Sequence, residues 1–579
     1  MNSDAFPLHQ DWALWEPFPP AFLFFAGAIL LALMQGPYRH RLQQIVLVLT
    51  PLVGLVNLLG LDAGSSFTWT VLHFELDQLR VDRLSMLFGL LFHVGALLAV
   101  IYALKVRDTF QHVAALAYAG SALGAVFAGD LISLFFYWEG MALSSAFLVW
   151  AGRSPDANAA GLRYLGLHLL SGLLLLAGAV IHYQTTGQIA FDFLGTETVA
   201  GGLILLAFGI KCGFPLLHTW ITDAYPQSTP SGTVFLSMFT TKVAVYALAR
   251  GFPGTDVLIP IGTIMALFPI FYAVIENDLR RVLGYSMINQ IGFMVVGVGI
   301  GTELALNGAV AHAFNEVLFK GLLFMTMGAV LLKVRHVLGS DLGGLYRSMP
   351  LTTAFCVVGA ASISAFPLFN GFVSKSMIMA AMIEQGHTWG WLALLFASAG
   401  VFHHAGIKIP YFAFFGHDSG LRVNEAPRNM LFAMGIAAGL CILTGSWPAL
   451  LYGLLPWEAG YLPYTYPHVI VQVQLLLFSA LAFAWLKLSG VYPAELRSVN
   501  LDADWLYRRL GLRLSVAAVG AFDYTSRVVS RPLRVNARLA LERVFGPGSL
   551  LTRSAETGTA ALLVGVMLAG YLLIYYVIT

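Results

Sequence analysis

The sequence predicts an all-α, polytopic membrane protein with about 14–16 transmembrane helices. Of its 579 residues, 58% are hydrophobic and only 11% are charged, whereas a soluble chain is typically about 45–50% apolar and about 25% charged. Apolar runs of about 18–20 residues, the length that spans a bilayer, recur along the chain. The connections between these runs are short, so we expect no inserted soluble domain.

Charge and cysteine content narrow the class further. The 32 Lys+Arg and 30 Asp+Glu leave a net charge of +2, which excludes a nucleic-acid binder that works through a basic surface. With so few charges the chain fits neither a soluble enzyme nor a disordered protein. Cys212, Cys356 and Cys441 lie far apart, which argues against cysteine-ligated iron–sulfur clusters and disulfides. We expect buried apolar cysteines, no cofactor and no metal ion.

The membrane spans can be followed from the N-terminus. No Lys or Arg precedes Arg39, so the apolar run at about 21–36 reads as a retained span rather than a cleavable signal peptide. Further runs are centred at about residues 52, 94, 120, 141, 172, 208, 240, 267, 290, 320, 358, 380, 400, 437, 478 and 567, and those between 350 and 412 can be divided in more than one way. Basic residues gather in the loops at 39–41, 105–107, 153–163, 280–281 and 333–347. The positive-inside rule places these loops in the cytoplasm and the N-terminus outside.

The segment 501–548 breaks the apolar pattern. It is too charged to span a membrane and reads as an amphipathic helix that lies along the membrane or along neighbouring helices. Its spacing places four arginines on one helical face: Arg527, Arg531, Arg534 and Arg538. About 45 helical residues would reach on the order of 65 Å, and we expect Pro532 to kink or interrupt the helix. A last span at about 557–577 follows.

Ionisable side chains inside the apolar runs are the candidate functional residues. Such a side chain is unfavourable in a membrane span unless it is paired or hydrated, so it indicates function by default. The set comprises Glu139, Lys211, Lys242, His312, Glu316, Lys320 and Lys375. The spacing of His312, Glu316 and Lys320 at i, i+4 and i+8 aligns them in one stripe of a helix. Lys242, Tyr246 and Arg250 repeat that spacing.

Helix-breaking residues lie beside two of these lysines. Gly213 and Pro215 follow Lys211, and Pro367, Asn370 and Gly371 precede Lys375. The tripeptide Phe-Pro-Leu occurs at both places, at 214–216 and 366–368. Interrupted helices free backbone groups that must face protein or water, and in transporters they mark ion pathways.

Simpler structural roles compete with the functional one. A single buried pair such as Glu139 with Lys211 could only fix helix register. His218 lies near a helix end, where a role at the membrane interface and a role in the ion pathway are equally compatible with the sequence. Four other histidines, His93, His168, His403 and His404, fit packing or hydrogen bonding better, and no spacing specifies a bis-histidine haem. Asp278, Arg280 and Arg281 fit a solvated helix cap.

Five segments resemble the antiporter-like subunits of respiratory complex I and of multisubunit Mrp-type Na+/H+ antiporters. They are GDLISLFFYWEGM (129–141), GIKCGFPLLHTWITDAYPQSTPSGTVFLSMFTTKVAVYALAR (209–250), ENDLRRVLGYSMINQIGFM (276–294), HAFNEVLFKGLLFM (312–325) and SAFPLFNGFVSK (364–375). The resemblance covers roughly residues 80–415, in the order of the family. Two shorter segments, HAGIKIPYFAFFG (404–416) and LDADWLYRRLG (501–511), are most similar to the D-type subunit of Mrp antiporters.

This resemblance implies a fold of two inverted five-helix repeats with discontinuous helices and a polar axis at mid-membrane. It implies that Glu139 and Lys211 form a charge pair, that Lys242 is the central lysine and that Lys375 is the terminal ionisable residue. His312 and Lys320 match connecting positions, whereas Glu316 replaces a histidine of many relatives. The implied division is N-terminal helices at 1–110, the antiporter-like core with both repeats at 111–415, additional transmembrane helices at 416–500, a lateral helix that braces neighbouring subunits at 501–556, and a last span at 557–579.

The expected function is proton translocation across the membrane along a central row of these side chains, as a subunit of a multisubunit Mrp-type antiporter. Transport of H+ alone and exchange of H+ for Na+ both stay open. We expect Glu316 to hold Lys320 protonated and His312 to relay protons at neutral pH. The expected partners are the lipid bilayer and other membrane subunits, with no nucleic acid. We expect a bacterial inner membrane location.

Other functions stay open. The chain could be the pumping subunit of a complex I-like NADH:quinone oxidoreductase, without redox chemistry of its own, or belong to a membrane hydrogenase or an inorganic-carbon uptake complex, as a pump or as a scaffold. A subunit that itself binds quinone or carries electrons is disfavoured, because cysteine clusters, phosphate-binding glycine loops and a soluble domain are missing from the sequence. A lone solute transporter fits the Lys-rich row poorly.

Overall fold

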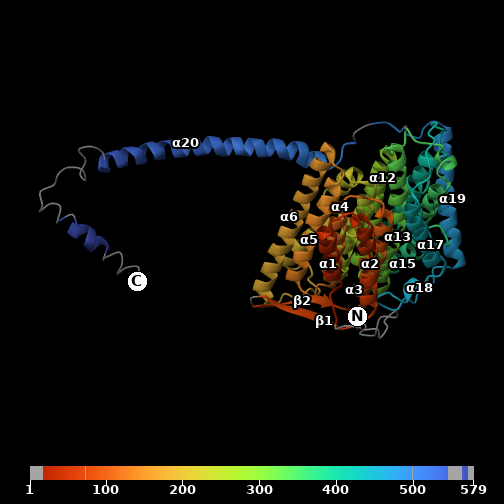
Figure 1. The fold of residues 1–579 in the computed structure, drawn as a ribbon, viewed down its shortest axis with the longest axis horizontal. Helices are drawn as coiled ribbons and strands as arrows, with labels where there is room; N and C mark the ends of the chain where they lie inside the picture. The colour runs from red at the N-terminus through yellow and green to blue at the C-terminus, as the bar shows by residue number, and fades with distance from the viewer. Residues whose placement is uncertain are drawn as a thin grey trace. The chain divides into compact units, whose positions relative to one another are not determined.

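The computed structural model describes residues 17–71, 73–493, 495–497, 500–545, 562 and 564–571. The chain divides into two compact units, residues 1–500 and 501–579. The first unit is a bundle of helices with one small hairpin (Figure 1). Its elements are α1 (Pro20–Leu33), α2 (Arg39–Leu59), β1 (Ser66–Val71), β2 (Phe74–Arg80), α3 (Arg83–Ala103), α4 (Thr109–Phe127), α5 (Leu131–Trp150), α6 (Pro155–Thr186), α7 (Val199–Cys212), α8 (Thr219–Ala224), η1 (Tyr225–Gln227), α9 (Pro230–Met238), α10 (Thr240–Gly251), α11 (Leu258–Ile275), α12 (Leu279–Ile300), α13 (Glu303–Val334), η2 (Leu345–Arg347), α14 (Pro350–Ile363), α15 (Asn370–Glu384), α16 (Thr388–Val401), η3 (Phe402–Lys408), η4 (Tyr411–Phe415), α17 (Arg428–Ser446), α18 (Ala449–Tyr452) and α19 (Tyr466–Leu488).

The helices make the chain an integral membrane protein. Among the described residues, 12 helices are long and apolar enough to cross a membrane, and three shorter ones, α1, α7 and α14, are also apolar. The helices α7 and α14 are the first halves of broken spans. Counted with α1 and the 12 long helices, they agree with the predicted 14–16 transmembrane helices. Of the predicted last span at 557–577, only residues 562 and 564–571 are described, and they are helical. The rest of that span lies outside the described residues.

Burial separates the central helices from the peripheral ones. In the most apolar 18-residue stretch of each span, all residues of the α9–α10 span are buried, as are 94% of those of α12. For α19 the share is only 11%. The buried spans, α9 with α10 and α12, can carry polar side chains, because protein groups surround them. The centre of the bundle is therefore where the fold can hold ionisable residues.

Two five-span repeats can be recognised from matching elements. The first consists of α4, α5, α6, α7 with α8, and α9 with α10, and the second of α11, α12, α13, α14 with α15, and α16 with η3 and η4. The third span has 32 residues in both repeats. Asp130 and Asp278 cap the second spans and pair with Ala190 and Leu338 in matching bridges. Because five crossings is an odd number, the second repeat starts on the opposite side of the membrane, and the repeats are inverted as predicted.

Both predicted helix breaks are present. The helix α7 ends at Gly213, which adopts φ +79°, and Leu216 follows at φ +70°. At the second break Ala365 has φ +57° and Leu368 has φ +75°. Left-handed backbone at residues other than glycine is unfavourable by about 1–2 kcal/mol, so these residues persist only where the surrounding structure requires them. The Phe-Pro-Leu tripeptides thus mark equivalent interruptions in the two repeats.

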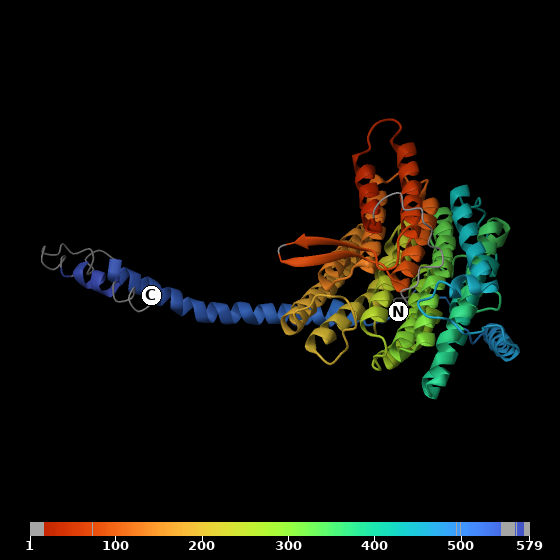
Figure 2. The same cartoon turned by 90° about the horizontal axis from the view of Figure 1, so that it is seen from below.

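The antiparallel hairpin of β1 and β2 was not predicted. Its register pairs Ser66 with Arg80 and Val71 with Phe74, with an irregularity between Phe67 and Thr68. Figure 2 shows the two strands reaching out to one side of the helices. The sequence SFTWTV is rich in β-branched and aromatic residues, a strand signal that the surrounding helical pattern concealed. The hairpin leads directly into the capping residue of α3, Asp82.

The second unit contains a π-helical turn, η5 (Leu506–Gly511), and the long helix α20 (Leu512–Phe545). The 34 residues of α20 correspond to about 51 Å. Of the predicted kink or interruption at Pro532, the interruption is wrong, because α20 continues through it. A proline removes one N–H donor, and the turns on either side keep their own hydrogen bonds. Arg538 pairs with Glu542 at 3.0 Å one turn away; the side chains of Arg531 and Arg534 lie outside the described residues.

Candidate functional site

All eight predicted site residues belong to the described part of the first unit, and seven of them are buried. Five are 0% exposed: Lys211, Lys242, His312, Glu316 and Lys320. His218 and Lys375 are 2% and 3% exposed, and Glu139 is partly buried. A buried charge is strongly unfavourable without partners, so the contacts of each group decide what it can do.

Lys211 lies in the last turn of α7, immediately before the break. Its Nζ donates a hydrogen bond to the Trp138 carbonyl at 2.5 Å and lies 4.3 Å from the centre of the Trp138 ring. Glu139, the next residue on α5, forms no ion pair within 4.0 Å among the described residues, although its charge and that of Lys211 act on each other. The predicted charge pair is therefore electrostatic and not a direct contact.

A glycine on α6 leaves room for the Glu139 carboxylate. An ideal Cβ added to Gly172 would lie only 1.5 Å from Glu139 Oε1. Within the described structure this oxygen is buried and accepts no hydrogen bond. The carboxylate thus occupies a narrow space beside α6, where a small movement changes its distance from Lys211.

Lys242 and Glu316 form the one direct ion pair among the predicted site residues in the described structure, and it joins α10 to α13. Lys242 Nζ also donates to the Ser237 carbonyl at 2.9 Å and to Thr241 Oγ1 at 3.2 Å. The helix is interrupted at Phe239, where α9 ends and α10 begins. This break leaves the Ser237 carbonyl available to the ammonium.

Glu316 contacts Lys242 directly and not Lys320, whose protonated form it was predicted to favour. Lys320 Nζ instead donates to Ser286 Oγ on α12 at 2.8 Å, while the Glu316 charge still acts on it. Spacing on α13 places Glu316 and Lys320 on one stripe, but the kinked start of α10 brings Lys242 closer to the carboxylate. Sequence spacing does not report such a contact between distant segments.

His312 links α13 to α12 and α15. Its Nδ1 lies 3.0 Å from Ser374 Oγ and its Nε2 lies 3.1 Å from Gln290 Oε1. Lys375, next to Ser374, donates to the Ile363 carbonyl at 3.3 Å, at the end of α14. The histidine therefore adjoins the terminal lysine through one intervening residue.

Electrostatic interactions link two sets of these groups, Glu139 with Lys211 and Lys242 with Glu316, Lys320, His312 and Lys375, which together we call the row. The charge of Lys242 acts on Cys212, the neighbour of Lys211 in sequence, and the charges of Lys242, Lys320 and Lys375 all act on His312. The row therefore runs from α5 and α7 through α10 and α13 to α15.

Lys375 opens onto a cavity of about 230 Å³. Ser376, Tyr461, His468 and Gln472 are among the other residues that line it. Apolar side chains such as Phe372, Met379 and Trp391 line the rest of it, and a space of this size has room for several water molecules beside the polar groups. The row thus ends at a space where hydrated protons or other small cations fit.

The other predicted histidines differ in their surroundings. His218 starts α8 beyond the first break, and its ring centre lies 4.6 Å from that of Phe268 on α11. His168 stacks against Tyr164 at 4.1 Å and meets Trp220 at 4.6 Å, in agreement with a packing role. Within the described residues no cluster of three or more His, Cys, Asp or Glu side chains is arranged to hold a metal ion.

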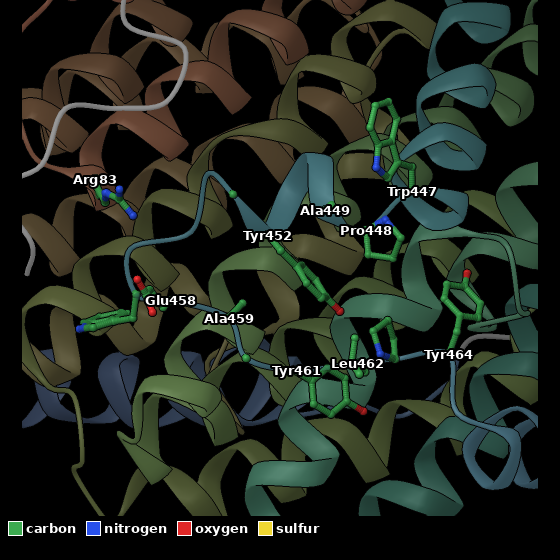
Figure 3. Close-up of a pocket in the computed structure, with 14 residues that line it drawn as sticks. Arg83, Trp447, Pro448, Ala449, Tyr452, Glu458, Ala459, Tyr461, Leu462 and Tyr464 are labelled. Atoms are coloured by element: carbon green, nitrogen blue, oxygen red, sulfur yellow. The ribbon is translucent and has the colours of Figure 1, made fainter.

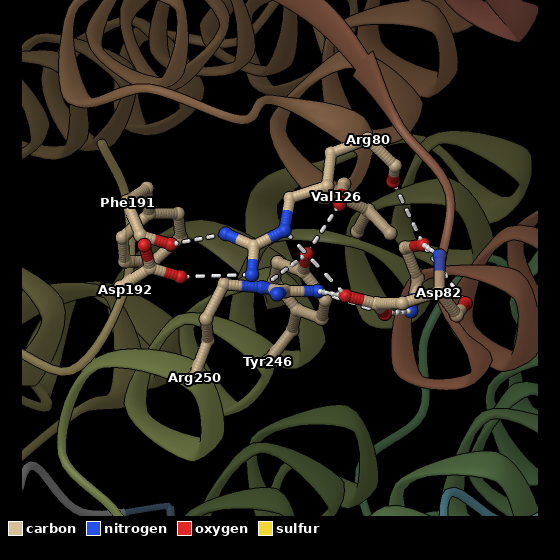
Figure 4. A network of polar contacts seen from close by, with 8 residues as sticks. Arg80, Asp82, Val126, Phe191, Asp192, Tyr246 and Arg250 are labelled. Carbon is tan, nitrogen blue, oxygen red and sulfur yellow. Dashed lines mark hydrogen bonds and ion pairs between the residues drawn. The ribbon is translucent and has the colours of Figure 1, made fainter. Parts of the chain in front are cut away.

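A polar network holds Arg250, the last residue of the stripe formed by Lys242, Tyr246 and Arg250 (Figure 4). Arg250 donates to both carboxylate oxygens of Asp82, at 3.0 and 2.8 Å, and its Nε donates to the Tyr246 hydroxyl at 2.8 Å. The hydroxyl in turn donates to the Val126 carbonyl. A guanidinium does not release its proton in proteins, so this end of the stripe holds α10 in place and does not pass protons.

Asp82 joins that network to the hairpin and to α3. Its side chain accepts the Ser85 N–H at 2.9 Å and caps α3. Burial by itself would raise the pKa of Asp82, but Arg250, the Ser85 N–H and Arg80 together hold that pKa below its ordinary value. Arg80 extends the network to the exposed Asp192 at 2.8 Å. The carboxylate therefore stays ionised and keeps α10 tied to α3.

A larger cavity, of about 720 Å³, lies between α3 and the loop after α17 (Figure 3). Arg83 and Glu458 lie at one end of it in this view, and Trp447 and Tyr464 at the other. None of the eight predicted site residues lines this cavity. It is therefore separate from the row of buried charges.

One buried lysine was missed from the sequence. Lys408 lies in the apolar segment HAGIKIPYFAFFG and is 0% exposed. Its Nζ forms an ion pair with Glu495 at 3.1 Å. The signal that could have found it is the one used for the other lysines, a charge inside an apolar run.

Comparison with known proteins agrees with this architecture. Residues 128–402 match a family model described as NADH:quinone oxidoreductase/Mrp antiporter, TM. Hydrogenase-4 component B of Escherichia coli K12 is 27% identical over 428 residues, 64% of this chain and 63% of that protein. One Na(+)/H(+) antiporter subunit of Alkalihalophilus pseudofirmus is 28% identical over 428 residues, 64% of this chain and 52% of that protein. The chain therefore spans less than two thirds of the length of these relatives.

A solved structure extends the comparison to most of the chain. One protein of the membrane-bound sulfane sulfur reductase, an archaeal respiratory membrane complex, superposes with a TM-score of 0.70 at 24% identity. The superposition covers 97% of this chain and 100% of that protein. At this identity the similarity establishes a shared fold.

Proposed function

We propose, for a chain that belongs to the antiporter-like membrane subunits related to Mrp antiporters and complex I, that it translocates protons across the membrane as part of a multisubunit Mrp-type antiporter. One observation carries this proposal: ionisable groups from five spans lie buried or partly buried in the bundle, and electrostatic interactions link Glu139 to Lys211 and Lys242 to Glu316, Lys320, His312 and Lys375. Such groups inside a membrane protein are expensive and indicate an ion pathway.

The first step concerns the Glu139–Lys211 end of the row. A nearby carboxylate favours a charged ammonium, and its withdrawal favours release of the proton. Glu139 is not in contact with Lys211, so a small movement in the space beside Gly172 changes their interaction. We infer that this movement drives the proton of Lys211 toward Lys242.

The middle of the row stores and relays charge. Glu316 stabilises the charged form of Lys242 through direct contact. Lys320 and His312 follow on the same helix, and the imidazole exchanges protons readily at neutral pH. Water must bridge the groups that do not touch, and serine and glutamine side chains at Ser286, Ser374 and Gln290 supply hydrogen-bond partners along the way.

The far end of the row is Lys375. This residue lines the cavity of about 230 Å³, which supports a role as the last site before water. Exchange for Na+ fits the same row, since Glu316 is an acidic group where a cation could bind. We place the chain in a bacterial inner membrane, with the N-terminus outside and the basic loops in the cytoplasm, among other membrane subunits.

A second candidate is the proton-pumping subunit of a complex I-like oxidoreductase, a membrane hydrogenase or an inorganic-carbon uptake complex. The similarity to hydrogenase-4 component B and the fold shared with a respiratory membrane complex favour it. The row of buried charges serves both candidates equally. The neighbouring genes separate them, because small Mrp-like subunits, hydrogenase subunits or NADH dehydrogenase subunits each point to one complex.

The function is tested by Glu139→Gln and Lys211→Ala in the complete complex. Each variant is expected to abolish proton movement, followed with a pH-sensitive dye in everted membrane vesicles, because each removes one member of the pair that starts the row. Both proteins should accumulate in the membrane at the wild-type level. The control Glu303→Gln changes an exposed acid at the start of α13 and should transport normally. Wild-type transport in both Glu139→Gln and Lys211→Ala contradicts the proposal.

A further inference from the structure

The last span of the second repeat is irregular around a second group of buried ionisable residues. After α16 the chain continues as the π-helical segment η3, which carries His404 and Lys408. Both residues are 0% exposed. π-Helical segments are rare and occur frequently at functional sites, and neither residue belongs to the row described above.

Three backbone carbonyls and one carboxylate surround the ammonium of Lys408. Its Nζ donates to the carbonyls of Ala273, Val274 and Glu276 at 3.2, 2.7 and 2.6 Å, at the end of α11. Glu495, 6% exposed at its side chain, provides the opposite charge at 3.1 Å. The ammonium thus connects the π-helical segment, the end of α11 and the segment that follows α19.

His404 lies four residues before Lys408 in the same π-helical segment. The Gly400 carbonyl, one helical turn earlier, is a hydrogen-bond partner for one ring nitrogen, and within the described residues neither nitrogen meets a second partner. The charges of both Lys320 and Lys408 act on it. A fully buried imidazole that satisfies at most one of its two ring nitrogens is unfavourable, and this unsatisfied capacity is what a relay residue would use.

The outer end of this group approaches the surface. Glu276 accepts a hydrogen bond from Asn500 at 3.2 Å and lies 3.7 Å from Arg281, whose side chain is 30% exposed. Burial raises the pKa of Glu495, although Lys408 opposes that effect. A carboxyl group with a raised pKa takes up a proton more readily than an exposed glutamate does. Arg281 belongs to the basic loops assigned to the cytoplasm.

We propose that Glu495, Lys408 and His404 form a second branch of the proton row, which connects Lys320 to the side of the membrane on which Arg281 lies. This inference rests on the proposed function. A proton taken up by Glu495 passes to Lys408 when its amine is neutral, and then through His404 and bridging water to Lys320. The row then has one opening at this branch and another at the cavity beside Lys375.

A structural clamp would use the same contacts, so the test must separate the two roles. Lys408→Arg keeps a positive charge and N–H donors for the α11 carbonyls, but a guanidinium does not release a proton. A relay predicts a loss of transport on the order of 100-fold, whereas a clamp that accepts the larger guanidinium predicts wild-type transport and one that does not predicts a loss, so the other two variants decide. His404→Gln and Glu495→Gln are the second and third variants, since both keep polar side chains of similar size and neither can carry the proton.

The measurement is dye-monitored proton movement in vesicles from the source cell, with each variant replacing the chromosomal copy so that the complex is intact. The branch is supported if the three variants accumulate normally and all lose transport while the control Lys333→Gln, at the end of α13, keeps it. Wild-type transport in His404→Gln and Glu495→Gln overturns the branch, even if Lys408→Arg is inactive, because a clamp then explains the loss. A wild-type chain that moves no protons overturns the proposed function itself, and the branch with it.

Discussion

Replacing Glu316 with glutamine is expected to abolish proton movement and to lower the free energy of unfolding by about 3–5 kcal/mol. The reason is that Lys242 and Glu316 form a direct ion pair with both side chains 0% exposed. Removal of the carboxylate leaves the ammonium buried without its counter-charge. The melting temperature of the detergent-solubilised protein and dye-monitored transport in vesicles measure the two effects.

A double variant separates stability from function at this pair. Replacement of both charges by apolar side chains of similar size, Lys242→Met with Glu316→Leu, is often neutral for stability or stabilising. We therefore expect the double variant to regain much of the lost melting temperature and to stay inactive in transport. Recovery of transport in the double variant would show that the pair is only a structural contact.

Replacing Gly172 with alanine is expected to remove transport with little change in stability. The new Cβ would lie 1.5 Å from Glu139 Oε1, and the end of a flexible glutamate side chain can swing away while the helices stay in place. A displacement of about 1 Å at a reacting group can reduce a rate about 100-fold. Vesicle transport and melting temperature are again the measurements.

Gly166 supplies the matched control on the same helix. An ideal Cβ added there meets no atom within 4 Å, so Gly166→Ala should keep full transport and gain about 0.5–1 kcal/mol from the lower flexibility of the unfolded chain. Equal transport in Gly172→Ala and Gly166→Ala would mean that the position of Glu139 does not control the row.

The sequence was sufficient for the features that depend on local composition. Apolar length identifies the spans, and glycine and proline beside Lys211 and Lys375 identify the two broken helices. Spacing on one helix also placed His312, Glu316 and Lys320 in one stripe. Each of these predictions uses residues that are close together in the chain.

Features that depend on contacts between distant segments could not be predicted. Glu316 pairs with Lys242, 74 positions earlier, because the break at Phe239 redirects α10. Glu139 does not contact Lys211, because the ammonium instead binds the Trp138 carbonyl and lies over the Trp138 ring. Lys408 carries the same local signal as the other lysines, but its pairing with Glu495, 87 positions later, is a contact between distant segments. The roles of all these residues in transport, and the division of the chain into domains, stay predictions.

The account depends on a continuous hydrated connection between the buried groups. A high-resolution experimental map of the assembled complex that shows ordered water tests this most directly. We expect water molecules to bridge Lys211 to Lys242, Lys242 to Lys320, and His312 to Lys375 and its cavity. Close-packed hydrocarbon side chains without water between any two of these groups would contradict the account.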